Sequence, residues 1–218
     1  MTSHDDDLLT ALRERMVRSQ LRGRGVCDPR VLDAMARVPR HEFTHERDRE
    51  QAYEDYPLPI GEEQTISQPF IVALMLELLD LKPTDKVLEV GTGSGYVTAL
   101  LAEMAAQVIS IERHATLAER AREVLQRLGY RNVTVLVGDG SQGFEPSAPY
   151  NAILVSAAAA AVPAPLSTQL AEGGRMVIPV GPAEAQQLQL VRRENSQIRT
   201  TLREACRFVP LISDKAYS

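Results

Sequence analysis

Cysteine is scarce in this chain, since only Cys27 and Cys206 occur among its 218 residues. Two cysteines provide neither a disulfide framework nor a cysteine-based metal cluster. A chain of this length has no need of such cross-links, because folding buries about 70% of the surface of the unfolded chain. The low cysteine content therefore predicts a reducing compartment.

Long hydrophobic runs and a secretory leader are also lacking. Residues 1–7 are acidic, whereas a secretory signal is basic and then apolar. The longest apolar stretch, residues 152–166, is interrupted by Ser156, Pro163 and Pro165. It is shorter than the roughly 20 residues that span a bilayer. We expect no membrane segment and a cytoplasmic location.

An excess of positive charge is the third absence. The formal net charge is -5 and the isoelectric point is near 5.5. A general nucleic-acid binder needs a basic face, so this balance argues against one. With 44% hydrophobic and 24% charged residues and no internal repeat, the composition is that of a single globular unit. We expect it to be a monomer.

The chain divides into two regions of different character. Residues 1–68 are expected to form a helical preamble and a loop packed on the core. Apolar residues recur there at helical spacing, and Asp28 followed by Pro29 is typical of a helix start. Residues 69–218 are expected to form the main α/β domain.

The second region alternates between helices and strands. Helices are expected at residues 69–79, 96–106, 115–128 and 165–170, and strands at residues 86–90, 108–112, 132–137, 152–156, 175–180, 187–192 and 200–209. Strands separated by helices of about a dozen residues imply right-handed crossovers and a parallel sheet covered on both faces. The predicted fold class is α/β, a doubly wound, mostly parallel, Rossmann-like sheet with an N-terminal helical extension.

Ligands of such sheets lie beyond the carboxyl ends of the strands, so the residues found there are candidates for the site. The first strand ends in Glu89-Val-Gly91-Thr92-Gly93-Ser94-Gly95 and the second in Glu112-Arg113. The third ends in Asp139-Gly140 and the fourth in Ser156-Ala157. Glu112 can accept both hydroxyls of a ribose, Asp139 suits an adenine amino group, and the small residues leave room for a second substrate.

The glycine spacing distinguishes between cofactors. A dinucleotide fingerprint requires its third glycine at position 96, where this chain has Tyr96. The observed G-x-G-x-G spacing, with the acidic Glu112 17 positions after Gly95, suits an adenosyl ligand without a pyrophosphate. S-adenosylmethionine is therefore the expected cofactor.

Six motifs are distributed along the chain, namely AYEDYPLPIG (52–61), QTISQP (64–69), VLEVGTGSGY (87–96), SIER (110–113), GDG (138–140) and VIPVG (177–181). Through these motifs, most of the chain resembles the protein-L-isoaspartate O-methyltransferase family. The resemblance implies methyl transfer from S-adenosylmethionine to the free α-carboxylate of isoaspartyl residues in damaged proteins. The methyl ester then closes to a succinimide without the enzyme and reopens partly to normal aspartate.

The resemblance also assigns roles to residues. It places Ser67 in the active site, Thr65 and Ile66 in the isoaspartyl pocket with Ser156 and Ala157 opposite, and Ser213 in a closing segment. The residues expected to bind the cofactor are Glu89, Gly91, Thr92, Gly93, Ser94, Gly95, Glu112, Arg113, Asp139 and Gly140. No metal is expected, and no general base, because the acceptor carboxylate is already ionised near neutral pH.

Several residues depart from the family's pattern. Glu62 and Glu63 precede the QTIS segment, where the family has a small residue, and would repel an anionic substrate unless they point outward. Asn151 replaces an aspartate, Ser156 a threonine, and the alanine run 157–161 an Ala-Ala-Pro turn. We expect these changes to affect peptide affinity and loop geometry more than cofactor binding.

Other interpretations stay open at this point. Ser67 or Gln68 can simply cap the helix that begins at Pro69. His41-Glu42-Phe-Thr-His45 matches the H-E-x-x-H pattern of zinc proteases, although its charged context is poor. The chain can also be a methyltransferase of RNA or of a small molecule, or a module that binds isoaspartyl sites without catalysis.

Overall fold

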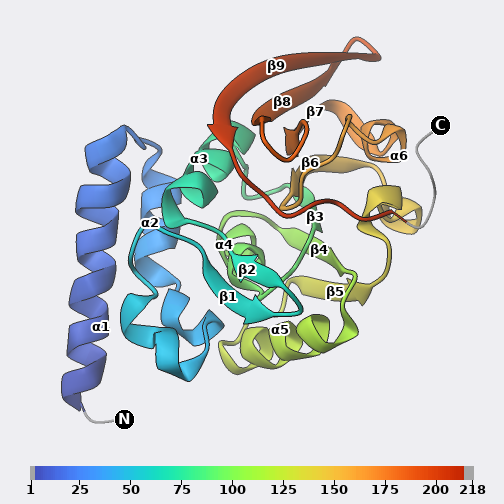
Figure 1. Ribbon diagram of the computed structural model, residues 1–218. Coiled ribbons are helices and arrows are strands. Elements are labelled where there is room, and N and C mark those ends of the chain that lie inside the picture. The colour runs from blue at the N-terminus through green and yellow to red at the C-terminus, as the bar shows by residue number, and fades with distance from the viewer. Residues whose placement is uncertain (1–2, 214–218) are drawn as a thin grey trace.

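A seven-stranded sheet organises the protein, in the order β5-β4-β3-β6-β7-β8-β9 (Figure 1). The computed structural model describes residues 3–213. Strands β3 to β7 are parallel, whereas β8 and β9 add antiparallel strands at one edge. The strands are β3 (Lys86–Val90), β4 (Gln107–Glu112), β5 (Val133–Val137), β6 (Tyr150–Val155), β7 (Leu170–Val180), β8 (Gln186–Glu194) and β9 (Gln197–Cys206).

Two hydrophobic cores fill the two faces of the sheet, because strand residues alternate between them. Val87 and Val108 belong to a large core, whereas Leu88 and Ile109 belong to a smaller one. The helices on the large core are α1 (Ser3–Arg15), α2 (Pro29–Arg37), α3 (Pro69–Leu79), α4 (Tyr96–Met104) and α5 (Ala115–Arg127). The predicted doubly wound, mostly parallel fold is confirmed.

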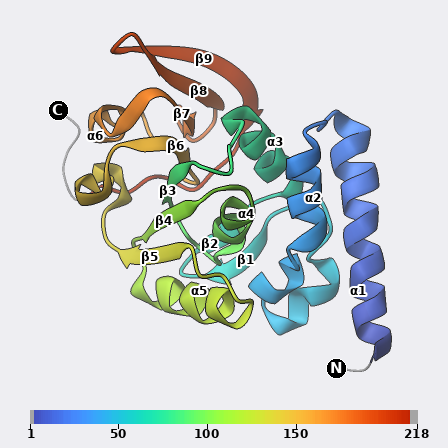
Figure 2. The same ribbon diagram turned by 180° about the vertical axis from the view of Figure 1, so that it is seen from behind.

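The smaller core has a thinner cover. It lies beneath the short helix α6 (Ala164–Thr168) and the 3-10 turns Gly140–Gln142 and Glu145–Ser147 (Figure 2). Leu166 of α6 and Tyr150 at the start of β6 are completely buried there. Sheet coverage is therefore unequal, with five helices on one face and mainly turns on the other.

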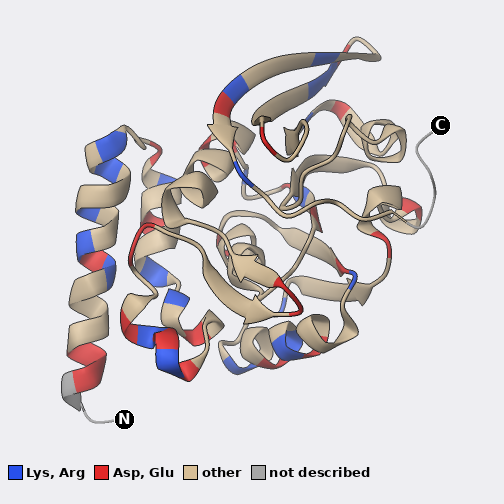
Figure 3. Ribbon diagram, in the orientation of Figure 1, with Lys and Arg blue, Asp and Glu red and all other residues tan. Residues whose placement is uncertain are grey.

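The N-terminal region joins the larger core. Its other elements are a π-helical segment (Met16–Leu21) and the 3-10 segments Arg22–Arg24, Arg40–Phe43 and Glu46–Gln51. Asp28 caps α2 by accepting a hydrogen bond from the Arg30 amide, as the sequence predicted. Acidic residues lie in the first turn of α1 and arginines toward its other end, in the sense that opposes the helix dipole (Figure 3).

Several strand boundaries differ from the prediction, and the largest differences are in β7 and β9. β7 begins at Leu170 rather than near residue 175, because Leu170 pairs with Tyr150 across an irregularity in the register. β9 ends at Cys206 rather than near residue 209, because the chain then leaves β8 and pairs with the loop after β6. Leu211 donates a 2.7 Å hydrogen bond to the Ala158 carbonyl, and the Ala158 amide donates to Val209.

The segment before α3 was predicted to be a loop, but it forms a hairpin. Its strands are β1 (Leu58–Gly61) and β2 (Gln64–Ile66). Glu62 and Glu63 form the turn, with φ of 50° and 56°. Both values are positive, as a two-residue type I′ turn requires and as glycine or asparagine adopts most readily. Since no glycine or asparagine marks this turn, the sequence gives little sign of it.

None of the helices between residues 3 and 213 is long and apolar enough to cross a membrane.

Glu63→Gly should raise the free energy of unfolding by about 1 kcal/mol, because glycine relieves the left-handed strain at this position. Urea denaturation of both proteins would measure the change. Glu63→Ala is the matched control, since it removes the same carboxylate but keeps the Cβ atom. Equal stability of the glycine and alanine variants would show that charge, not backbone strain, matters here.

Candidate active site

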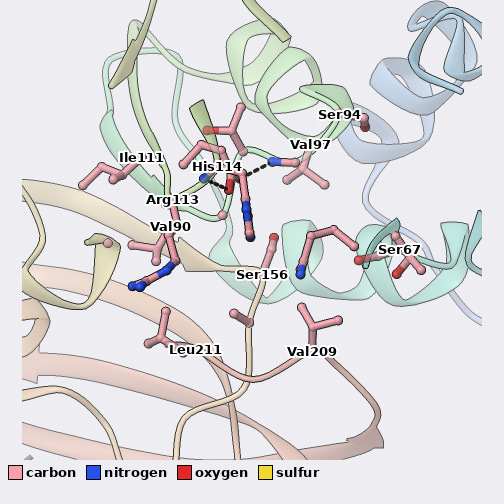
Figure 4. A pocket seen from close by; sticks show the side chains of 18 of the residues that line it. Ser67, Val90, Ser94, Val97, Ile111, Arg113, His114, Ser156, Val209 and Leu211 are labelled. Atoms are coloured by element: carbon pink, nitrogen blue, oxygen red, sulfur yellow. Dashed lines mark hydrogen bonds between the residues drawn. The ribbon is translucent and has the colours of Figure 1, made fainter. Parts of the chain in front are cut away.

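A cavity of about 820 Å³, including its open mouth, lies at the carboxyl ends of the parallel strands. The strand order reverses between β3 and β6, and this switch point is where open α/β sheets bind ligands. Figure 4 shows Val90, Ile111 and Ser156 around it, at the ends of β3, β4 and β6. We call this cavity the donor pocket.

The glycine loop between β3 and α4 forms one wall of the donor pocket. Gly91, Gly93 and Gly95 have φ of 93°, 53° and 89°, a region that side-chain-bearing residues adopt only with strain. A Cβ atom on Gly91 would lie 3.4 Å from the Ser156 Cβ atom. The loop after β3 thus lies directly against the loop after β6.

Glu112 joins this loop to the end of β4. Its carboxylate accepts hydrogen bonds from the Gly93 amide at 2.8 Å and the His114 amide at 2.9 Å. The side chain is only 5% exposed, yet it lines the donor pocket. A carboxylate has about four acceptor positions, so two such bonds leave capacity for ligand hydroxyls.

Glu89 lies beneath the loop and does not line the donor pocket. It is completely buried, and its Oε2 accepts hydrogen bonds from Thr98 at 2.5 Å and Ser110 at 2.6 Å. Its Oε1 has no hydrogen-bond partner among residues 3–213. Burial raises the pKa of Glu89 to about 8, so the carboxyl group is largely neutral at pH 7.

A second cavity opens beside the first, and we call it the acceptor pocket. It is lined by residues of three regions, namely Pro57, Thr65, Ser67, Gln68, Ile71, Ser156, Ala205, Cys206, Arg207, Phe208 and Val209. Thr65, Ser67, Ser156 and Val209 line both cavities. These four residues form a common wall, and Figure 4 shows three of them, Ser67, Ser156 and Val209, around the space between.

The Ser67 hydroxyl is free in the part of the chain that the structure describes. The N-cap of α3 is Gln68, which makes no side-chain capping bond. The capping hydrogen bond comes instead from Asp55, which is distant in the sequence. Its Oδ1 accepts a 3.0 Å hydrogen bond from the Phe70 amide. Gln68 therefore occupies the N-cap position, but neither its side chain nor that of Ser67 caps the helix.

Most of the predicted site residues come together around the two cavities. Those that line at least one of them are Thr65, Ile66, Ser67, Gly91, Thr92, Gly93, Ser94, Glu112, Arg113, Gly140, Ser156 and Ala157. Those that line neither are Glu89, Gly95, Asp139 and Ser213. Their predicted direct contact with a ligand therefore has no support from the geometry.

Three of these four residues support the site from behind. A Cβ atom on Gly95 would lie 3.2 Å from the Ala121 Cβ atom, so this glycine lets α4 approach α5 closely. Ser213 is 2.9 Å from the Ser141 hydroxyl and donates to Asp139 at 3.2 Å. The last pair ties the C-terminal segment to the loop after β5.

Several residues that line the pockets were not predicted as site residues. They are Pro57, Gln64, Gln68, Ile71, Val90, Tyr96, Val97, Ile111, His114 and the segment from Ala205 to Ile212. His114 follows Glu112 and Arg113, so its position after a strand end was a usable signal. The C-terminal segment reaches the site only through its pairing with Ala158, which no local pattern shows.

The H-E-x-x-H motif does not form a metal site. Residues 40–43 are a 3-10 turn and Thr44 is extended, so no α-helix brings His41 and His45 to one face. His41 Nδ1 lies 2.6 Å from the Tyr53 hydroxyl, and Glu42 pairs with Arg49 and Arg127. Among the described residues no group of three or more histidines, cysteines, aspartates or glutamates is placed to hold a metal ion.

Among the departures from the family pattern, Glu62, Glu63 and Asn151 lie outside both pockets, whereas Ser156 and Ala157 line the site. Glu62 and Glu63 line neither pocket, and Glu62 accepts a 2.6 Å hydrogen bond from Thr116 of α5. Asn151 accepts a 2.9 Å hydrogen bond from the Lys86 amide at the start of β3, far from the carboxyl ends of the strands. The electrostatic reason to expect weak peptide affinity is therefore absent.

Comparison with known proteins identifies a family. The family model described as protein-L-isoaspartate(D-aspartate) O-methyltransferase matches residues 12–216. A protein-L-isoaspartate O-methyltransferase from Koribacter versatilis is 56% identical over 94% of this chain and 93% of its own length. One from Syntrophus aciditrophicus is 54% identical over 94% of this chain and 96% of its own length.

Solved structures show the same relationship. A protein-L-isoaspartate O-methyltransferase structure superposes with a TM-score of 0.84 at 31% identity, covering 93% of this chain and 66% of that one. A Plasmodium falciparum structure described under the same enzyme name, in complex with S-adenosyl-L-homocysteine, gives a TM-score of 0.81 at 28% identity. It covers 92% of this chain and 98% of that one.

Glu89 should make stability fall as pH rises. Its pKa is raised to about 8 in the folded protein, whereas an ordinary glutamate has a pKa near 4.5. Between these values the folded state holds a proton that the unfolded state releases, so stability is full below about pH 4.5 and decreases through pH 8. Glu89→Gln should flatten this dependence, because it removes the titrating group. Between pH 5 and pH 8 the wild type should lose about 3 kcal/mol more of its free energy of unfolding than Glu89→Gln does.

Urea unfolding at a series of pH values would measure this dependence. Glu103→Gln is the control for loss of a carboxylate, since Glu103 accepts a hydrogen bond from Tyr130 and lines neither pocket. Parallel pH profiles for wild type and Glu89→Gln would show that Glu89 is ionised in the folded protein.

Proposed function

The chain belongs to the protein-L-isoaspartate(D-aspartate) O-methyltransferase family, and we propose that its two adjoining pockets divide the reaction between methyl donor and acceptor. The reaction is S-adenosylmethionine-dependent methyl transfer to isoaspartyl residues of damaged proteins. The observation that carries the division is the common wall, because transfer between two bound molecules requires them to meet at shared residues.

The residues of the donor pocket fit S-adenosylmethionine. Glu112 presents a buried carboxylate with spare acceptor capacity, which suits the hydroxyl pair of a ribose. A ligand can come close to the main chain of the glycine loop, because its glycines have no side chains. The apolar Val90, Ile111 and Leu211 suit a flat ring system. We therefore assign Glu112, Arg113, Gly140 and residues 91–94 to cofactor binding.

When bound, S-adenosylmethionine supplies a methyl group activated by the adjoining sulfonium. The chain itself has to bind the acceptor carboxylate, orient it and keep water away. Ser67 is suited to orientation, since its hydroxyl lies on the common wall and is free to donate a hydrogen bond to a carboxylate oxygen. No general base is required, because the carboxylate is ionised before it binds.

The rest of the acceptor pocket can position the damaged residue and its neighbours. Thr65 and Ser156 flank Ser67 on the common wall, while Ile66 and Ala157 extend the donor side. Arg207 is exposed at the rim and places a positive charge near the entering carboxylate. We assign these residues to substrate binding, with Ser67 as the catalytic side chain.

The proposal also covers the domain organisation, oligomeric state, location and binding partner of the enzyme. Residues 1–68 and 69–218 form one structural unit, a view supported by the large core that both share between residues 9 and 190; residues 1–2 and 214–218 lie outside the described residues. Monomeric action is supported by the two pockets, since residues of one chain line the described parts of both. The free Cys27 and Cys206 support a cytoplasmic location, and the net charge of -5 supports a protein rather than a nucleic-acid partner.

Glu112→Ala should weaken S-adenosylmethionine binding by about 1.5–3 kcal/mol, because it removes charge-assisted hydrogen bonds to the ligand and the support of the Gly93 amide. Titration calorimetry with S-adenosylmethionine or S-adenosylhomocysteine would measure the loss. Glu103→Ala removes a carboxylate outside both pockets and should bind normally. Unchanged affinity of Glu112→Ala would remove this residue from the cofactor site.

Ser67→Ala should lower kcat by roughly ten- to a hundredfold, because the acceptor carboxylate loses one orienting donor. The dissociation constant of the cofactor should change less than about threefold, since the group acts on the acceptor side. The assay is transfer of base-labile label from S-adenosylmethionine to an isoaspartyl peptide, beside the same peptide with normal aspartate.

Ser167→Ala, in α6 and outside both pockets, is the matched serine control and should be fully active. Equal loss of catalysis and cofactor binding in Ser67→Ala would make Ser67 a structural residue of the donor pocket. Full activity of Ser67→Ala would remove its catalytic role.

A further inference from the structure

Arg40 is a buried charge outside both pockets, and the reaction as described so far does not use it. Its side chain is completely buried, and no carboxylate within the described residues forms an ion pair with it. One guanidinium nitrogen, Nη1, has no hydrogen-bond partner among residues 3–213. Burial lowers the pKa of Arg40 to about 10, so the guanidinium remains charged at neutral pH.

Two main-chain carbonyls hold the guanidinium. Nε donates to the Ala52 carbonyl at 2.7 Å and Nη2 to the Ser67 carbonyl at 2.8 Å. These residues stand at the two ends of the segment that contains hairpin β1–β2. The face of the guanidinium lies 4.8 Å from the centre of the Tyr96 ring, at the start of α4. Arg40 therefore fixes both ends of the hairpin segment against the helix that follows the glycine loop.

Burying a charged side chain in a hydrophobic core is energetically unfavourable. Burial of an arginine without a carboxylate costs several kcal/mol, and an apolar residue of similar volume would pack there without that penalty. The planar fork of arginine can reach two carbonyls of fixed separation at once, which lysine and apolar residues cannot do. The position therefore favours orientation of the chain over maximum stability.

We propose that Arg40 is a positioning residue for catalysis, which holds the acceptor-wall segment Thr65–Ser67 in register with the donor pocket through the Ser67 carbonyl. This inference rests on the proposed acceptor role of that segment. Arg40 itself touches neither pocket, so it acts only through the main chain that it holds.

Neighbouring contacts hold the main chain at a second point, just after Ser67. Asp55 accepts a 2.7 Å hydrogen bond from Gln68 in addition to the one from Phe70, and it forms an ion pair with Arg24. The Arg24 guanidinium lies 3.6 Å from the centre of the Phe70 ring. The free Ser67 hydroxyl thus stands on a main chain that Arg40 holds at the Ser67 carbonyl and Asp55 holds just after it.

The test compares Arg40→Met with Arg175→Met. Arg175 serves as the control, because its guanidinium also bonds to main-chain carbonyls, including that of Asn151 at 3.0 Å, but the residues it holds line neither pocket. Unlike Arg40, it also forms an ion pair with the Asp85 carboxylate. Both variants are assayed at a temperature where circular dichroism shows them to be folded. Kinetic constants are measured with an isoaspartyl peptide, and cofactor affinity by calorimetry.

Arg40→Met should lower kcat by roughly ten- to a hundredfold while the cofactor dissociation constant stays within about threefold, since displacement of a reacting group by about 1 Å costs a factor of this size. Arg175→Met should keep the wild-type kcat. Arg40→Lys, which keeps the charge and can make one of the two bonds, should be intermediate and provides a variant that folds if Arg40→Met does not. A kcat loss in Arg40→Met or Arg40→Lys that matches Arg175→Met, or that is accompanied by equal loss of cofactor affinity, would overturn the proposal.

The double variant Arg40→Met/Ser67→Ala separates this inference from the role of Ser67. If Arg40 acts through the segment that carries Ser67, the two losses should be clearly less than additive. Where Ser67→Ala alone lowers kcat, additive losses would overturn the positioning role. Full activity of Ser67→Ala alone, with selective loss in Arg40→Met, would remove the proposed role of the Ser67 hydroxyl but keep Arg40 as the residue that positions the wall.

Discussion

The Glu112 carboxylate is the contact on which the geometry of the donor side depends. It accepts hydrogen bonds from the Gly93 and His114 amides, so one side chain joins the loops after β3 and β4. The glycine loop has three residues at positive φ and cannot keep one conformation through its own steric preferences. A charge-assisted acceptor at the end of β4 supplies the missing restraint. Binding and loop conformation are therefore coupled through the same group.

The wall of the acceptor pocket is held together in a different way. Its wall is assembled from β2, the loop after β6 and the segment after β9, which are far apart in the sequence. Backbone pairing of Ala158 with Val209 and Leu211 holds one part, and the side chains of Arg40 and Asp55 hold the other. The N-terminal region is thus a supporting frame for the wall as well as a cover for the sheet.

Sequence patterns predicted the sheet and the donor pocket well, because both depend on local signals. Apolar runs such as residues 86–90 and the glycine loop identify strands and turns directly. The position along the strand could have separated Glu89 from Glu112, since Glu89 pairs with Ser110 inside the sheet, whereas Glu112 ends its strand. Identical side chains on neighbouring strands thus differ in role because Glu112 lies two positions further along than the residue that faces Glu89.

The acceptor wall was less predictable, because long-range contacts build it. The turn at Glu62 and Glu63 has no glycine or asparagine signal, and Arg40 is one arginine in a segment rich in charges. Nothing local distinguishes a buried arginine from a solvated one, although burial decides what it does. An enzyme whose nucleophile arrives ionised needs little acid–base chemistry, and most of its contribution is placement. In such an enzyme the groups that hold the main chain are as much part of the catalytic apparatus as the side chains that face the substrate.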